Sequence, residues 1–167
     1  MKITRIVVPT DFSDDSEAAF QWARHLSVAL GASIDLLHVV ENPMAAGVWS
    51  SSMYTAEVKG LQINLVRDAE RRLRQFGPKM AGTRGGVQRT VRVGDSAQQI
   101  VAFAAARDAD LIVMGTRGKT GLSHVLMGSV AEHVSRTAPC PVVTVKSNQA
   151  YEKLARAARK TSRKVPA

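Results

Sequence analysis

The stretch Gly115–Ser129, GTRGKTGLSHVLMGS, contains residue types that hold phosphate groups in proteins. Its Gly-Lys-Thr matches the end of a Walker A phosphate loop, which needs Gly-x-x-x-x-Gly-Lys-Thr and a helix that opens directly after the lysine. The first glycine of that motif would fall at position 113, which is Val113, and no helix start is evident before Gly128. We therefore reject the Walker A interpretation. What remains is a different pattern, Gly-x2-Gly-x9-Gly-Ser, formed by Gly115, Gly118, Gly128 and Ser129.

This glycine pattern still has the chemistry of an anion site. Gly115 and Gly118 let backbone amides approach a phosphate chain, because glycine has no side chain to hold the ligand away. Gly128 and Ser129 present the amides and the hydroxyl of a helix N-terminus to anionic oxygen. Arg117 adds positive charge. A solvated loop that carries ordinary glycines and a surface cation is the alternative interpretation.

A second distinctive segment, Pro9-Thr10-Asp11, follows the first apolar run of the chain. A carboxylate at this position lies at the carboxyl end of a strand, just before a helix, where open α/β sheets bind their ligands. Asp11 suits ribose hydroxyls or a magnesium ion, which takes few protein ligands and several waters. The same carboxylate could instead cap the following helix. His38 ends the second strand nearby, and we interpret it as a packed, hydrogen-bonded histidine because no nucleophile motif accompanies it.

The segments that must position these residues alternate between apolar runs and helical periodicities. Strands are expected over Ile3–Val8, Ser33–Val40, Gly86–Gly94, Ala109–Gly115 and Cys140–Lys146. Helices are expected from Ser13 to Gly31, from about Val58 to Phe76, from Asp95 through Ala105, and from Gly128 or Ser129 to about Thr137. This order predicts one doubly wound α/β domain, with a five-stranded parallel sheet covered on both faces. If the first and fourth strands are neighbours, Asp11 and the glycine pattern face each other across one cleft.

Composition limits the setting of this domain. The chain has 167 residues, 45% of them hydrophobic, which suits a single globular domain. Its only cysteine, Cys140, excludes an internal disulfide framework and is compatible with a reducing compartment. No stretch approaches 18 apolar residues, and the N-terminal apolar run is too short for a signal peptide. We therefore expect a cytoplasmic protein that does not span a membrane.

The net charge of +9 is concentrated near the C-terminus. Residues 151–167 carry six basic side chains against one acidic side chain, which is more than half of the excess. We therefore divide the chain into a domain over residues 1–147 and a basic tail over residues 148–167. A tail of this kind could contact nucleic acid or anionic lipid through counterion release. A solvated tail that aids solubility is the simpler interpretation.

Four segments together resemble the universal stress protein family over roughly residues 2–146: IVVPTDFSDDSEAAFQWA, IDLLHVV, DADLIVMGTRGKTGLSHVLMGSVAEHV and APCPVVTVK. The complete Gly-x2-Gly-x9-Gly-Ser signature is similar to that of the ATP-binding branch of this family. The resemblance implies a Rossmann-like sheet of the adenine nucleotide alpha hydrolase type, with strand order 3-2-1-4-5. That order would make the first and fourth strands neighbours.

The resemblance also implies roles for individual residues around ATP. Adenine and ribose would lie along Pro9, Thr10 and Asp11, with the backbone of Val39 at the adenine edge. The ribose and the first phosphate would be flanked by Met114 and Gly115. The phosphates would be lined by Gly118, Gly128, Ser129 and Val130, with Arg117 at a position that is often basic. Separately from the resemblance, a magnesium ion held through the phosphates near Asp11 is expected, because Mg²⁺ takes few protein ligands and several waters.

The family further implies a homodimer that pairs through the last strand, about Pro141–Lys146. The sequence supplies its own reason, because the valines of this strand would form an uncovered apolar edge that pairing would hide. The leading functional hypothesis is a nucleotide-binding regulator of the stress response with little or no turnover. Alternatives are a slow ATP-hydrolysing enzyme that uses the same cleft, a binder of another adenine nucleotide such as cyclic AMP, or a nucleic-acid-binding protein that works through the tail.

Overall fold

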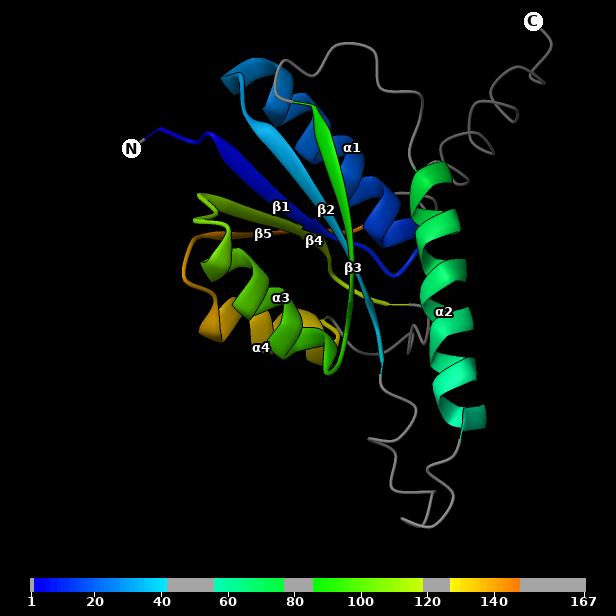
Figure 1. Ribbon diagram of the computed structural model, residues 1–167. Helices are drawn as coiled ribbons and strands as arrows, with labels where there is room; N and C mark the ends of the chain where they lie inside the picture. The colour runs from blue at the N-terminus through cyan, green and yellow to red at the C-terminus, as the bar shows by residue number, and fades with distance from the viewer. Residues whose placement is uncertain (1, 42–55, 77–85, 119–126, 148–167) are drawn as a thin grey trace, which may run out of the picture.

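The computed structural model describes residues 2–41, 56–76, 86–118 and 127–147, and strands and helices alternate along them (Figure 1). In chain order the elements are β1 (Arg5–Pro9), α1 (Asp14–Leu30), β2 (Ser33–Val40), α2 (Ala56–Gln75), β3 (Val87–Val93), α3 (Ser96–Ala106), β4 (Leu111–Gly115), α4 (Ser129–Thr137) and β5 (Val142–Val145). The basic tail lies outside the described residues.

The strands form a parallel sheet in the order β3-β2-β1-β4-β5, which confirms the predicted fold class. In β1 and β4, Ile6 pairs with Leu111 and Val7 pairs with Ile112. The first and fourth strands are therefore neighbours, which is the condition for the segments that follow them to share one cleft. The strand order reverses between these two strands, and ligands of open α/β sheets bind at such a point.

Helices cover both faces of the sheet (Figure 1). On one face, Phe20 of α1 and Leu73 of α2 are almost fully buried against inward-facing residues of β1, β2 and β4. On the other face, Ile100 and Phe103 of α3 pack with Val134 of α4 against the opposite side of the same strands. Burial on both faces explains why the central strands read as continuous apolar runs.

Local backbone chemistry sets the ends of α1, as the sequence predicted. Ser13 is the N-cap, and its side chain accepts a hydrogen bond from the backbone N–H of Ser16. Gly31 ends the helix in the left-handed conformation, with φ of 70°, which glycine adopts without steric cost. Between β1 and this helix, Phe12 has a φ of 64°, a conformation that is rare for a residue with a side chain.

Strands β1, β3, β4 and β5 begin one or two residues after their predicted starts, and a local reason is visible for β1 and β4. β1 begins at Arg5 rather than Ile3 because the Asp110 side chain accepts hydrogen bonds from the backbone N–H groups of Thr4 and Arg5, at 2.8 and 3.0 Å. It also includes Pro9 as its last residue, where a missing N–H is tolerated. β4 begins at Leu111 rather than Ala109 because the backbone N–H of Ala109 closes the end of α3.

The alternation expected of the third strand is present in part. Val87 and Val91 are partly buried and pack against the core cluster that contains Leu73 of α2. No residue of β3 is fully buried, because the strand lies at the edge of the sheet and pairs only with β2 among the described strands.

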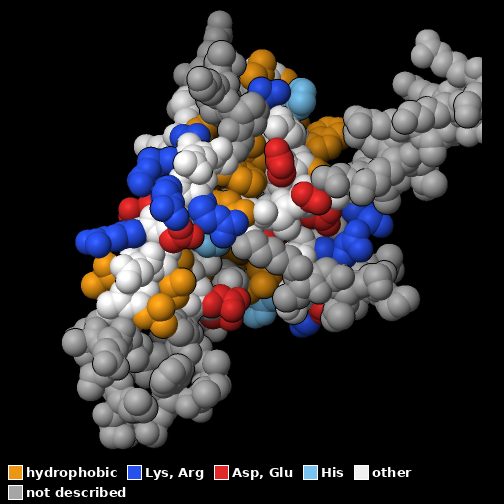
Figure 2. Space-filling view, turned by 90° about the vertical axis from the view of Figure 1, so that its right-hand side faces the viewer, with side chains coloured by type: hydrophobic (Ala, Val, Ile, Leu, Met, Phe, Trp, Pro, Cys, Tyr) orange, Lys and Arg blue, Asp and Glu red, His pale blue; other side chains and the backbone are white. Residues whose placement is uncertain are grey.

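The outer face of α2 is divided by side-chain type (Figure 2). Its C-terminal half exposes the basic side chains of Arg67, Arg71, Arg72 and Arg74. Its N-terminal half exposes large apolar side chains at Leu61, Ile63 and Leu65. Among the helices described here, none is long and apolar enough to cross a membrane.

Candidate functional site

A cleft of about 450 Å³ opens at the carboxyl ends of β1, β2 and β4. The lining includes every residue that the sequence predicted for the site: Pro9, Thr10, Asp11, Val39, Met114, Gly115, Arg117, Gly118, Gly128, Ser129 and Val130. Segments that are far apart in the chain therefore meet around one space. The cleft lies at the reversal of strand order, as expected for a ligand site in such a sheet.

Asp11 and Gly118 are in close contact across this cleft. A Cβ atom added to Gly118 would lie 3.0 Å from Asp11 Oδ2, closer than ordinary van der Waals contact. Asp11 Oδ1 accepts hydrogen bonds from the backbone N–H and the hydroxyl of Ser13, at 3.1 and 2.6 Å. Asp11 thus shapes the turn that leads into α1, while Ser13 itself caps the helix. Its carboxylate still borders the cleft.

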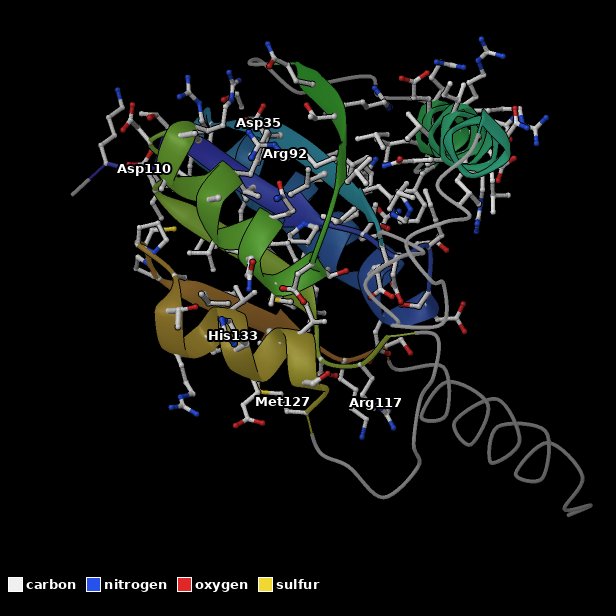
Figure 3. All side chains as sticks on the ribbon, turned by 60° about the horizontal axis from the view of Figure 1, so that its bottom comes forward. Asp35, Arg92, Asp110, Arg117, Met127 and His133 are labelled. Carbon is white, nitrogen blue, oxygen red and sulfur yellow. The ribbon has the colours of Figure 1, made fainter. Side chains whose placement is uncertain are left out.

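The N-terminus of α4 forms one end of the cleft. The backbone N–H of Gly128, the N-cap, donates to the carbonyl of Thr116 at 2.8 Å, which fixes the helix start against the loop after β4. No described side chain caps the first-turn amides that begin at Ser129. Arg117 and Met127 lie near this same end of α4 (Figure 3). Helix amides, the helix dipole and a guanidinium together make this end attractive to an anion.

Sequence reasoning missed a buried carboxylate, Asp15, in the first turn of α1. It joins this helix to the residues that follow β4 and to the residue pair that follows β5. Its Oδ2 accepts a hydrogen bond from the Thr116 hydroxyl at 2.9 Å and lies 3.7 Å from Arg117 Nε. Its Oδ1 accepts from the backbone N–H of Ser147 at 2.9 Å. Burial raises the pKa of the Asp15 carboxyl, but the hydrogen bonds from Ser147 and Thr116 and the charge of Arg117 outweigh burial, so the pKa lies below its ordinary value. Asp15 is therefore an ionised carboxylate, and it holds Thr116 and Arg117 in position.

The turn after β1 is held by a short chain of hydrogen bonds. The hydroxyls of Thr10 and Ser16 lie 3.0 Å apart, and Phe12 donates its backbone N–H to the Thr10 hydroxyl at 3.0 Å. His38 Nδ1 lies 2.7 Å from the Thr10 carbonyl oxygen, which only accepts, so Nδ1 carries the proton. The Phe12 ring lies 4.4 Å from the His38 ring and 4.1 Å below the Arg72 guanidinium. His38 is thus a packed, hydrogen-bonded strand residue, as the sequence indicated.

The other end of the cleft is formed by β2 and the N-terminus of α3. Leu37, Val39 and Ile100 give it apolar walls. Here the helix start is already capped, because Asp95 Oδ1 accepts a hydrogen bond from the backbone N–H of Gln98 at 2.9 Å. Glu41 is the carboxylate that lines the cleft at this end. The two ends therefore differ: the α4 end has a cation and uncapped helix amides, and the α3 end has the Glu41 carboxylate and a capped helix start.

The described residues contain no group of three or more His, Cys, Asp or Glu side chains that could hold a metal ion. A single carboxylate such as Asp11 could share a magnesium ion with a ligand, because Mg²⁺ keeps most of its waters and needs few protein ligands. Besides Asp15, sequence reasoning missed Glu41, which belongs to no motif, and it interpreted Ser96 only as part of a helix start. Only the fold brings these residues to the cleft.

The fold and the site define a doubly wound α/β protein whose sheet carries a cleft with one cation-lined, amide-rich end. Comparison with known proteins gives the family. The model of the universal stress protein family matches residues 2–146, and the chain belongs to this family. A curated relative, universal stress protein MJ0531 of Methanocaldococcus jannaschii, is 35% identical over 147 residues, which cover 85% of this chain and 81% of that protein.

Solved structures share the fold. Universal stress protein UspA from Lactobacillus plantarum superposes with a TM-score of 0.76 at 26% identity, covering 87% of this chain and 99% of that one. A universal stress protein in complex with cAMP has a TM-score of 0.56 at 23% identity, with 88% and 99% covered. The Archaeoglobus fulgidus protein in complex with dAMP has a TM-score of 0.52 at 23% identity, with 87% and 100% covered.

Proposed function

We propose that this chain binds ATP in the cleft between β1 and β4 and acts as a nucleotide-binding regulator of the stress response. The observation that carries the proposal is the meeting of Asp11 with the Gly118 loop beside the N-terminus of α4. A ribose hydroxyl pair matches the hydrogen-bonding capacity of a carboxylate, and a phosphate chain matches helix amides and a guanidinium. The volume of the cleft also lies in the range of small-molecule sites.

The charges of the cleft favour one orientation of the nucleotide. Glu41 at the α3 end repels phosphates, whereas Arg117 and the uncapped helix amides at the α4 end attract them. The phosphate chain therefore lies along Gly118, Gly128, Ser129 and Val130. The base lies against the apolar walls at the β2 end, beside Val39, with Pro9 and Thr10 beneath it. Met114 and Gly115 then flank the ribose and the first phosphate.

We propose that magnesium binds together with the phosphates of the nucleotide. The Asp11 carboxylate lies beside Gly118, and it would share the ion with phosphate oxygens and water. The metal would neutralise phosphate charge beside that carboxylate. Binding that is tighter with Mg-ATP than with ATP in a chelator is therefore expected.

We further propose that turnover is slow or absent. His38 is the histidine that lines the cleft among the described residues, and it is a packed strand residue with no nucleophile motif beside it. Asp11 Oδ1 accepts hydrogen bonds from the backbone N–H and the hydroxyl of Ser13. We expect phosphate release from Mg-ATP to remain near the uncatalysed background. Release above background that disappears in Asp11→Ala would support the alternative of a weak ATPase.

The phosphate groups of a ligand decide which adenine nucleotide we expect to bind best, because they are what the α4 end of the cleft contacts. Cyclic AMP has one phosphate, which is tied back to the ribose, so it cannot extend along the glycine loop. The complexes with cAMP and dAMP belong to chains that are similar to this one in fold alone. Competition of ATP, cAMP and AMP against a labelled ATP analogue distinguishes these occupants, and we expect ATP to compete best.

We also propose a homodimer that pairs through β5, and a basic tail that works apart from the nucleotide cleft. β5 is a terminal strand of the described sheet, and its Val143 side chain is 40% exposed. Pairing two such edges across a two-fold axis would cover both. Deletion of residues 148–167 is expected to leave ATP affinity unchanged. If nucleic-acid binding is detected and the deletion abolishes it, the tail has that separate role.

Thermal unfolding with added nucleotide tests the proposed function directly. Ligand at 100 times its dissociation constant stabilises the folded state by about 2.7 kcal/mol. For a domain of this size that corresponds to a rise in Tm of roughly 5–10 °C. Protein must first be shown free of carried-over nucleotide by mass spectrometry of the small molecules released on denaturation. An unchanged Tm in millimolar Mg-ATP would contradict the proposal.

A further inference from the structure

Phe12, the residue between Asp11 and the N-cap of α1, has a backbone conformation that is rare for its residue type. Its φ of 64° lies in the left-handed region, which is sterically unfavourable for a residue with a Cβ atom. Such a conformation persists only where surrounding contacts offset its cost, and it occurs most often at active sites and ligand sites. Contacts around the turn must therefore hold Phe12 in place.

These contacts come from α2, from the residue that follows α2, and from β1 and β2. The centre of the Phe12 ring lies 4.4 Å from that of the His38 ring and 5.6 Å from that of the Phe76 ring, which it meets edge to face. The Arg72 guanidinium lies 4.1 Å from the centre of the Phe12 ring, within the range of a cation–π interaction. The backbone N–H of Phe12 donates to Thr10 Oγ1 at 3.0 Å. The ring contacts and this hydrogen bond together stabilise the left-handed turn.

Asp11 lies on the cleft side of the same turn. Its side chain belongs to the cleft lining, whereas that of Phe12 does not. Asp11 Oδ1 accepts hydrogen bonds from the backbone N–H and the hydroxyl of Ser13, the residue after Phe12. Because the φ of Phe12 sets where Ser13 lies relative to Asp11, it also sets the direction of the carboxylate. The other oxygen, Oδ2, lies beside Gly118. A change in the backbone of Phe12 would therefore move the carboxylate relative to the glycine loop.

We propose that Phe12 is a positioning residue of the nucleotide cleft. Its ring, packed against Arg72 and His38, keeps the turn in the left-handed conformation and thereby orients the Asp11 carboxylate toward the ligand. This inference rests on the proposed nucleotide function and on the role of Asp11 within it. No described residue of α2 lines the cleft, so the inference gives this helix a part in ligand binding that acts through Phe12.

The experiment is a double-mutant cycle in ATP affinity, measured by calorimetry on the full chain in Mg²⁺ buffer. Its variants are Phe12→Leu, Asp11→Ala and the two combined, and Phe12→Leu keeps an apolar side chain but removes the ring. With Asp11 present, Phe12→Leu is expected to weaken ATP binding about tenfold, because a misplaced carboxylate loses a charge-assisted hydrogen bond. In the Asp11→Ala background the same substitution should change the affinity less than about twofold, because the two residues act as one unit.

The cycle separates positioning from a general effect on the fold. If Phe12 only supported the fold, Phe12→Leu would weaken ATP binding equally in both backgrounds, and the inference would be wrong. Urea unfolding followed by circular dichroism first establishes a temperature at which every variant is folded, and calorimetry is done at that temperature.

Arg72→Ala tests the same ring contacts from α2 and leaves every side chain of the turn in place, so it also serves if Phe12→Leu does not fold. It is expected to weaken ATP binding about two- to fivefold, again only when Asp11 is present. Arg74→Ala is the matched control, because it removes the same charge from an exposed side chain of the same helix outside the cleft lining. Its affinity for ATP should equal that of the wild type.

Three outcomes separate the inference from the proposed function. If the wild type binds ATP and both Phe12→Leu and Arg72→Ala keep its affinity, Phe12 does not position Asp11, and nucleotide binding stands. If Asp11→Ala binds ATP as well as the wild type does, Asp11 makes no contribution for Phe12 to orient, and the inference is again wrong. If the wild type does not bind ATP, the proposed function itself is wrong.

Discussion

Gly115, the last residue of β4, packs directly against the backbone of Asp15 in the first turn of α1. A Cβ atom added to Gly115 would lie 2.9 Å from the Asp15 carbonyl carbon and 3.0 Å from the Ser16 backbone nitrogen. The sequence suggested that this glycine allows backbone amides to approach phosphate. The structure adds a second requirement, because the strand and the helix approach each other so closely that no side chain fits between them.

Gly115→Ala is therefore expected to destabilise the fold, by about 1–3 kcal/mol, because backbone atoms of α1 must move to accept the methyl group. Urea unfolding followed by circular dichroism measures this change. Gly60→Ala is the matched control, since an added Cβ at Gly60 of α2 meets nothing within 4 Å. There alanine should stabilise the helix, by roughly 0.5–1 kcal/mol. Equal effects of the two substitutions would contradict the packing argument.

Asp15→Asn is expected to destabilise the protein at neutral pH, by about 1–3 kcal/mol, because a buried carboxylate loses hydrogen bonds that depend on its charge. The folded state lowers the pKa of Asp15 below its ordinary value of 3.8. The contribution of its charge is therefore fully present above that value and is lost as the pH falls through the folded pKa.

The free energy of unfolding, measured by urea titration from pH 7 down to pH 3, checks this expectation. The difference between wild type and Asp15→Asn should be largest at neutral pH and shrink toward pH 3. Asp110 also has a lowered pKa, through hydrogen bonds from Thr4 and Arg5, but both proteins contain it, so it cancels in the difference. A difference that is constant with pH would show that Asp15 does not act through its charge.

Arg117→Ala is expected to weaken ATP binding about tenfold or more, because it removes a cation from the phosphate end of the cleft. The loss should be smaller for AMP and absent for adenosine, which has no phosphate. Calorimetric titration with all three ligands measures the trend. Arg136→Ala removes the same charge from the exposed last turn of α4, outside the cleft lining, and should leave all three affinities unchanged. Equal losses for ATP and adenosine would mean that Arg117 acts only by supporting the loop.

Val143→Glu is expected to convert a dimer into a monomer, because it introduces like charges at the edge of β5 on both sides of a two-fold axis. Light scattering after gel filtration measures the mass. Val28→Glu is the control, because Val28 is 59% exposed and belongs to α1, not to the edge strand. A wild-type protein that elutes as a monomer at micromolar concentration would disprove pairing through this strand.

The sequence by itself determined the elements and much of the site. The strand Ser33–Val40 matches its prediction from end to end, because most of its residues are the apolar ones that a strand covered on both faces requires. Ser13 and Gly31 marked the ends of α1 because capping depends on local backbone chemistry. The glycine pattern and Asp11 identified the cleft, because open α/β sheets put the ends of neighbouring strands together.

Only the tertiary structure decided which distant charges meet. Asp15 reads as an ordinary acidic residue of a first helical turn, yet Thr116, Arg117 and Ser147 surround it once β4 and β5 are in place. Glu41 and Ser96 likewise meet only because β2 lies beside β3. Periodicity and capping act over a few residues, whereas these contacts join positions more than fifty residues apart. Their partners follow from sheet order, which no local pattern contains.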